Sequence, residues 1–127
     1  MLPIFLVPET ECRANGESGS FALGDAKGRM ISLTLGITRI IEQESLDVAI
    51  LGSADGVKWS EKPLFSFPQK FYCGTYTVFV DLTRHPDVAY LKAAWKMNRW
   101  GRGDPKPLFG FYVFAEEAQA LQAASAS

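Results

Sequence analysis

Apolar and polar residues alternate with a period of two along much of this chain. Residues 31–37 show the pattern most clearly, with an apolar side chain at every second position. Such alternation is typical of a strand with one buried and one exposed face. The pattern recurs in residues 46–50, 75–82 and 91–98, and the apolar positions of the four segments are Ile31, Leu33, Leu35, Ile37, Leu46, Val48, Ile50, Tyr76, Val78, Val80, Leu82, Leu91, Ala93, Trp95 and Met97.

Departures from the alternation predict local features. Ile40 and Ile41 break the phase of the first segment, which predicts a β-bulge at residues 36–39. Residues 42–45 are polar and predict a turn, so we expect the strands on either side of it to form a hairpin. Residues 108–114 are apolar on both faces, which is typical of a central strand.

The remaining segments are shorter and are interrupted by Gly or Pro. Residues 1–8 are apolar but contain two prolines, which favours an edge strand. Residues 13–28 are rich in Gly and small polar residues and predict a loop with a short strand near residues 21–23. A further short strand is expected at residues 63–67. About eight short strands without a convincing internal helix indicate an all-β sandwich or barrel.

Length and composition fit one such domain. The chain has 127 residues, 47% of them hydrophobic and 13% aromatic, which is enough for one core. We assign residues 1–116 to a single β-sandwich domain. Residues 117–127 form an Ala-rich C-terminal tail, which we expect to be a frayed helix or an extended arm.

Charge and cysteine content narrow the classes of partner. The net charge of −1 gives no basic excess for a phosphate backbone, so nucleic acid is not an expected partner. No stretch reaches the roughly 18 apolar residues of a membrane span. The apolar N-terminus lacks the positive region and cleavage site of a signal peptide, so a cytoplasmic location is expected by default. Cys12 and Cys73 are expected as free thiols, although the two could pair.

Residues 46–59 contain a turn with a distinctive sequence. Ser53 ends the preceding strand, and Asp55, Gly56 and Trp59 follow in the form Asp-Gly-x-x-Trp. The Asp55 carboxylate suits backbone hydrogen bonds, Gly56 suits a positive φ, and Trp59 is expected to close the turn by packing on the core. We interpret these residues as a structural turn.

This turn also suggests a family. Together with residues 88–95 and the apolar strand at 109–114, it resembles discoidin-like (coagulation factor type C) domains, over residues 29–116. The resemblance implies an antiparallel two-sheet jelly-roll sandwich of the galactose-binding-like type, with about eight strands. It also implies binding of glycans, lipid headgroups or proteins, but fold alone does not define function. The family's ligand loops do not carry over by motif, and Cys12 with Cys73 does not match the placement of its disulfide.

The sequence offers no convincing catalytic constellation. His85, the one histidine, precedes a proline in a polar segment, which favours a turn over a general base. Glu42 and Glu44 could act as paired carboxylates, but solvated surface charges are the commoner case. Asp25 is a weak candidate for a calcium ligand, and neither a zinc nor an Asp-x-Asp-x-Asp-Gly pattern is present. We therefore expect no enzyme activity, no metal and no cofactor.

Residues 96–107 are the segment best suited to a ligand. They place Arg99, Trp100, Arg102 and Asp104 in a Gly- and Pro-rich connection between the last two strands. Loops on a rigid sandwich often carry binding residues, and an aromatic ring beside charged groups suits a sugar. The alternative is that Trp100 packs at a sheet end while its neighbours stay in water.

A second loop could contribute to the same site. Lys70 and Tyr72 lie between Pro68 and Gly74, and they could join the same end of the sandwich. In this segment, Phe71 is expected to pack in the core and Cys73 to be buried.

Two functions remain open from the sequence. The first is a non-catalytic binding module for a carbohydrate or another polymer, with a glycan or a protein as its ligand. The alternative is a structural or assembly subunit that forms homo-oligomers, to which aromatic strands and apolar arms would contribute contacts. An enzyme ranks third.

Overall fold

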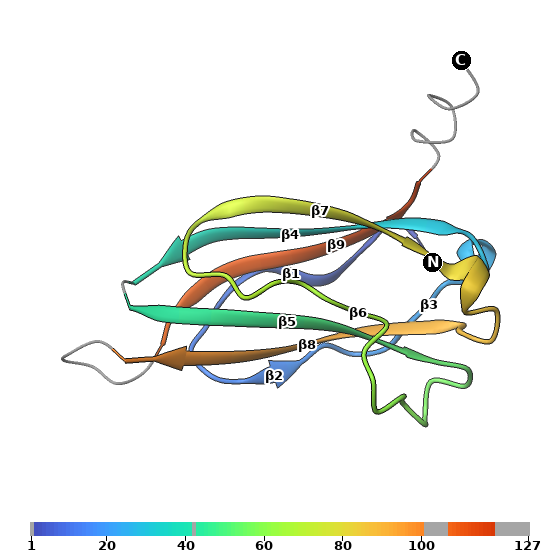
Figure 1. Ribbon diagram of the computed structural model, residues 1–127, viewed down its shortest axis with the longest axis horizontal. Coiled ribbons are helices and arrows are strands. Elements are labelled where there is room, and N and C mark those ends of the chain that lie inside the picture. The colour runs from blue at the N-terminus through green and yellow to red at the C-terminus, as the bar shows by residue number, and fades with distance from the viewer. Residues whose placement is uncertain (1, 42, 101–106, 119–127) are drawn as a thin grey trace, which may run out of the picture.

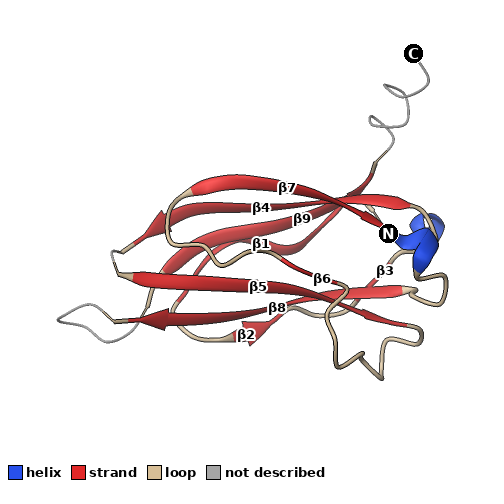
Figure 2. Cartoon of the chain, in the orientation of Figure 1, coloured by secondary structure: helices blue, strands red, loops and turns tan. Residues whose placement is uncertain are grey.

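Two antiparallel β-sheets pack face to face in the computed structural model, which describes residues 2–41, 43–100 and 107–118 (Figure 1). The four-stranded sheet has the order β1 (Ile4–Cys12), β9 (Phe109–Glu117), β4 (Met30–Ile40), β7 (Gly74–Asp81). The five-stranded sheet has the order β2 (Gly16–Glu17), β8 (Tyr90–Arg99), β5 (Glu44–Ser53), β6 (Phe65–Ser66), and β3 (Phe21–Ala22) also pairs with β8. Two 3-10 helices, η1 (Gly24–Ala26) and η2 (Leu82–Arg84), lie at one end of the sandwich (Figure 2). The predicted all-β sandwich is confirmed.

The connections between strands define the topology. The chain crosses from one sheet to the other at every connection except those from β2 to β3 and from β5 to β6. In a jelly roll the chain passes repeatedly between the two sheets in this way, so most neighbouring strands of a sheet are not consecutive in sequence. The predicted jelly roll is therefore confirmed.

The core lies between the two sheets and follows the predicted alternation. The apolar positions at every second residue of β4, β5 and β8 point inward, and the buried members of this set are Ile31, Leu33, Leu35, Ile37, Leu46, Val48, Ile50, Leu91 and Ala93. β9 lies between β1 and β4, so residues 109–115 are flanked by strands on both sides. The central position predicted for this strand is confirmed, as is the edge position of β1.

The predicted hairpin between β4 and β5 is wrong. β4 pairs with β7 and β9 in one sheet, whereas β5 pairs with β8 and β6 in the other. Alternation identifies the buried face of a strand but not its neighbour, because strands of both sheets bury the same kind of face. The polar turn is also shorter than predicted, since Glu44 and Ser45 are buried at the start of β5. The predicted bulge is confirmed as a register shift between Ile37 and Arg39.

The C-terminal segment is described only in part. β9 continues to Glu117, and the Ala118 amide donates a hydrogen bond to the Met30 carbonyl at 3.1 Å. The rest of the predicted tail, residues 119–127, lies outside the described residues.

Candidate functional site

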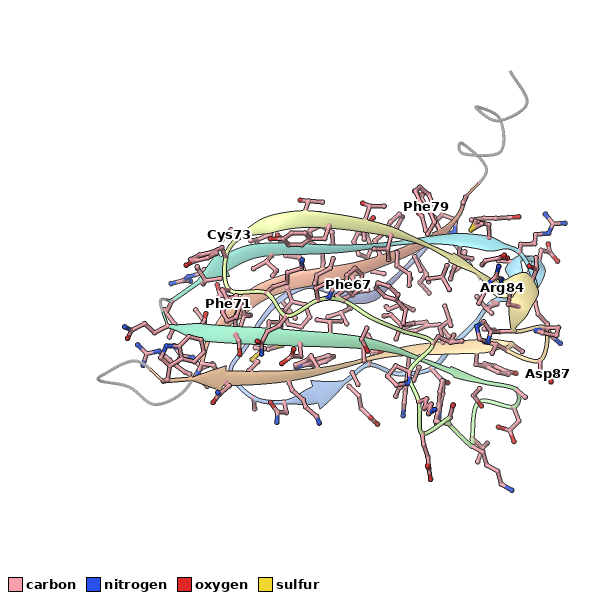
Figure 3. All side chains as sticks on the ribbon, viewed as in Figure 1. Phe67, Phe71, Cys73, Phe79, Arg84 and Asp87 are labelled. Atoms are coloured by element: carbon pink, nitrogen blue, oxygen red, sulfur yellow. The ribbon has the colours of Figure 1, made fainter. Side chains whose placement is uncertain are left out.

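Three exposed aromatic rings gather at one end of the sandwich, where β8 ends and the segment from β6 to β7 passes. The Phe71 ring centroid lies 6.1 Å from that of Trp100 and 6.5 Å from that of Tyr72. Their exposed fractions are 40% for Phe71, 56% for Trp100 and 72% for Tyr72. Figure 3 shows Phe71 at this end, beside the start of β5 and the end of β8. We call Phe71, Tyr72 and Trp100 the aromatic end.

The aromatic end borders a hollow of about 450 Å³. The other described residues that line it are Ile40 at the end of β4, Gln43 in the connection and Glu44 at the start of β5. This volume lies within the ~300–1,000 Å³ range of small-ligand sites.

Backbone hydrogen bonds hold the segments that carry these rings. Lys70 and Leu46 exchange two backbone hydrogen bonds, at 2.8 and 3.0 Å, which attach the Phe71 segment to the edge of β5. The Trp100 amide donates to the Gln43 carbonyl at 3.0 Å, and Gln43 adopts a positive φ of 62°. The backbone that presents the rings is therefore held from both sides. Less conformational entropy would then be lost in ordering these segments around a ligand.

A buried carboxylate supports the floor of the hollow. Glu44 is only 1% exposed; its Oε2 accepts a hydrogen bond from the Ile41 amide at 2.9 Å and its Oε1 from the Leu108 amide at 2.8 Å. Amide hydrogen bonds to both oxygens compensate for much of the cost of burying the charge. Glu44 thus ties the β4–β5 connection to Leu108, the residue that precedes β9. The interpretation of this residue as a solvated surface charge is wrong, and Glu42 lies outside the described residues.

Two of the other predicted ligand residues, Arg99 and Lys70, are described by the structure, and neither lines the hollow. Arg99 lies in β8, directly opposite Glu44 in the pairing of β5 with β8. The Lys70 ammonium lies over the Tyr76 ring, 3.7 Å from its centroid, and Lys70 is not among the residues that line the hollow. Arg102 and Asp104 lie outside the described residues.

The expectations that Phe71 packs in the core and that Cys73 is buried are both wrong. Both residues are exposed. The Lys70 backbone occupies the edge of β5, so the chain leaves the sheet immediately after it and carries Phe71 to the surface. The signal in the sequence was the adjacent Phe-Tyr pair in a segment bounded by Pro68 and Gly74.

The turn after β5 lies at the opposite end of that strand. Asp55 Oδ1 accepts hydrogen bonds from the amides of Lys58 and Val57 at 2.9 and 2.8 Å, and the Gly56 amide donates to Ser53 Oγ at 2.9 Å. The hydrogen bonds to the Asp55 carboxylate, that from the Lys58 amide above all and then that from the Val57 amide, lower the pKa of Asp55. Gly56 has a φ of 78°, which L side chains rarely adopt.

Trp59 packs differently from the expectation. Its ring lies over Lys92, with the ammonium 4.6 Å from a ring centroid, and Lys92 is on the outer face of β8. The ring therefore covers the outside of the five-stranded sheet and does not pack on the core.

The residues considered for catalysis and metal binding are dispersed. His85 is exposed and follows η2, where its amide donates to the Leu82 carbonyl at 3.0 Å. Asp25 is exposed in η1. Within the described residues, no group of three or more His, Cys, Asp or Glu side chains is arranged to hold a metal ion.

The two thiols are free, as expected. Cys73 is exposed, and Cys12 is half-buried in β1, where burial raises its pKa. Across the described part of the chain, none of the helices has the length and apolar character to span a membrane.

The sequence matches no known protein family and no curated protein. The geometry of the aromatic end is therefore the basis for assigning a function.

Proposed function

We propose that this protein is a non-catalytic binding module that takes a carbohydrate or another polymer at the aromatic end. The observation that carries the proposal is the cluster of three exposed rings, in which Phe71 contacts both Tyr72 and Trp100, beside a hollow of about 450 Å³. Exposed aromatic surface in water is costly, and large apolar patches on a rigid scaffold are typical of binding sites. The resemblance to discoidin-like domains, which bind ligands through their loops, supports the same function.

The chemistry of the hollow favours a neutral ligand. Glu44 is the one charged side chain among the described residues that line it, and both of its oxygens accept backbone hydrogen bonds. The Tyr72 hydroxyl and the Gln43 amide offer exposed donors and acceptors beside the rings. Sugar rings combine apolar faces with hydroxyl rims, so they match an aromatic wall edged by uncharged polar groups.

The test is retention of the protein by a panel of neutral and acidic polysaccharides in affinity electrophoresis. Tyr72→Ala and Trp100→Ala should each weaken binding to a retained polymer by about tenfold, as central interface aromatics do. Phe5→Ala is the matched control, because Phe5 is also an exposed aromatic but lies in β1, away from the hollow. Binding by no polymer, or an equal loss in Phe5→Ala, would overturn the proposal.

A further inference from the structure

Three of the four sheet edges are closed to additional strands. β1 contains Pro8, two register shifts in its pairing with β9, and the exposed acidic residues Glu9 and Glu11. On the five-stranded sheet, β6 is two residues long and lies between Pro63 and Pro68, and β2 and β3 are also two residues each. Short strands, prolines, bulges and charges are the usual means by which sheet edges avoid pairing with other chains.

The fourth edge, β7, has none of these protections. It is eight residues long and pairs with β4 in unbroken register from Gly74 to Asp81. In the part of the chain that the structure describes, β7 pairs with no other strand, so its outer N–H and C=O groups face away from the sheet. Residues 74–80 contain no proline and no charged residue, and they are rich in Thr, Val and aromatic residues that favour strands.

Apolar side chains on both faces of this edge are only partly covered. Tyr76 and Val78 point towards the core but are half-buried. Phe79 is on the outer face and 52% exposed, and Figure 3 shows it projecting away from the sheet. A strand placed beside β7 would cover apolar surface on both faces as well as pair the backbone groups.

We infer that β7 pairs with β7 of a second copy of this chain, antiparallel and about a two-fold axis, which joins two four-stranded sheets into one. A two-fold contact requires a surface that is complementary to itself, and an uncharged strand brings no like charges opposite each other. The strand also matches itself in this direction. A two-fold axis at Thr77 places Tyr76 opposite Val78 of the second copy, so the half-buried apolar side chains of the two strands face each other. This inference does not depend on the ligand of the aromatic end.

Analytical ultracentrifugation over a concentration series tests the inference on the full chain. Thr77 lies in the middle of β7 with its side chain exposed, so its two copies would lie nearest the axis. Wild type should form a concentration-dependent dimer, and Thr77→Lys or Thr77→Glu should each weaken it by about tenfold or more. A mixture of the two variants should recover the dimer, because opposite charges then face each other.

Thr10→Lys is the matched control, since Thr10 is an exposed threonine on the protected edge β1, and it should leave association unchanged. Thr77→Lys loses a solvent-exposed hydrogen bond of 3.1 Å with Thr34, so the variant should still fold. Circular dichroism checks that the fold is retained. If it does not fold, Thr75→Lys places the charge on the same exposed face. A monomeric wild type at all concentrations, undiminished association of the Thr77 variants, or no recovery on mixing would each overturn the inference.

Discussion

Phe71 and Trp100 meet edge to face with their ring centroids 6.1 Å apart, although one follows β6 and the other follows β8. The contact exists because two backbone attachments converge at this end of the sandwich. Lys70 pairs with Leu46 in β5, and Trp100 is bonded to Gln43. The proposed binding surface is made from separate connections and is positioned by the sheet, which is how rigid scaffolds present loop residues.

Glu44→Gln should destabilise the protein by about 2 kcal/mol. The substitution leaves one oxygen to serve the amides of Ile41 and Leu108 and turns an NH2 group towards the other. Urea unfolding measures the change. Glu116→Gln is the control, because Glu116 is an exposed carboxylate in β9 and its loss should be nearly neutral. Equal stability of Glu44→Gln and wild type would show that the buried carboxylate does not support this end.

Gly36→Ala should destabilise the protein by about 2 kcal/mol, because the Tyr112 ring lies directly against this glycine. An added Cβ would overlap atoms of the ring, well inside van der Waals contact. In a Tyr112→Ala background the same substitution should cost much less, and a double-mutant cycle measures the difference. Gly19→Ala is the control, since a Cβ there has no neighbour within 4 Å. Additive effects of the two changes would contradict the contact.

The contribution of the Asp55 turn to the free energy of unfolding should decrease at acidic pH. The pKa of Asp55 is lowered in the folded protein, so its charge stabilises the fold above the pKa of the unfolded chain, and this contribution is lost as the pH falls through the folded value. Asp55→Asn keeps an acceptor oxygen but removes the charge. Its urea midpoint should lie below that of wild type at neutral pH, and the two should converge below about pH 4. Asp87→Asn, at another exposed carboxylate, is the comparison. A difference that does not change with pH would contradict the role of the charge.

The faces of the strands could be predicted from the sequence, but their partners could not. The alternation around Leu33 and that around Leu46 both predict a buried face, yet the two residues lie in opposite sheets of the sandwich. Pairing depends on which connections cross the core, and a three-residue connection such as 41–43 can either turn back along one sheet or pass to the other. The short polar stretch carries no signal that distinguishes the two.

The aromatic end was predictable only in part. The Gly and Pro residues around Tyr72 and Trp100 predict loops, so the surface location of both rings follows from local sequence. The burial of Glu44 depends on the amide of Leu108, which is distant in sequence. The exposure of Phe71 depends likewise on a backbone pairing with β5. Long-range hydrogen bonds of this kind leave no periodic pattern.

The most direct test of the aromatic end is a fluorescence titration with the polymer that retains the protein most strongly. Trp100 is 56% exposed, whereas Trp59 and Trp95 are half-buried, so a ligand at the hollow should alter the emission of Trp100 above all. We expect a saturable change in the emission of wild type that is largely lost in Trp100→Phe. Saturable binding with unchanged emission, or the same change in Trp100→Phe, would place the ligand elsewhere and contradict the proposed site at the aromatic end.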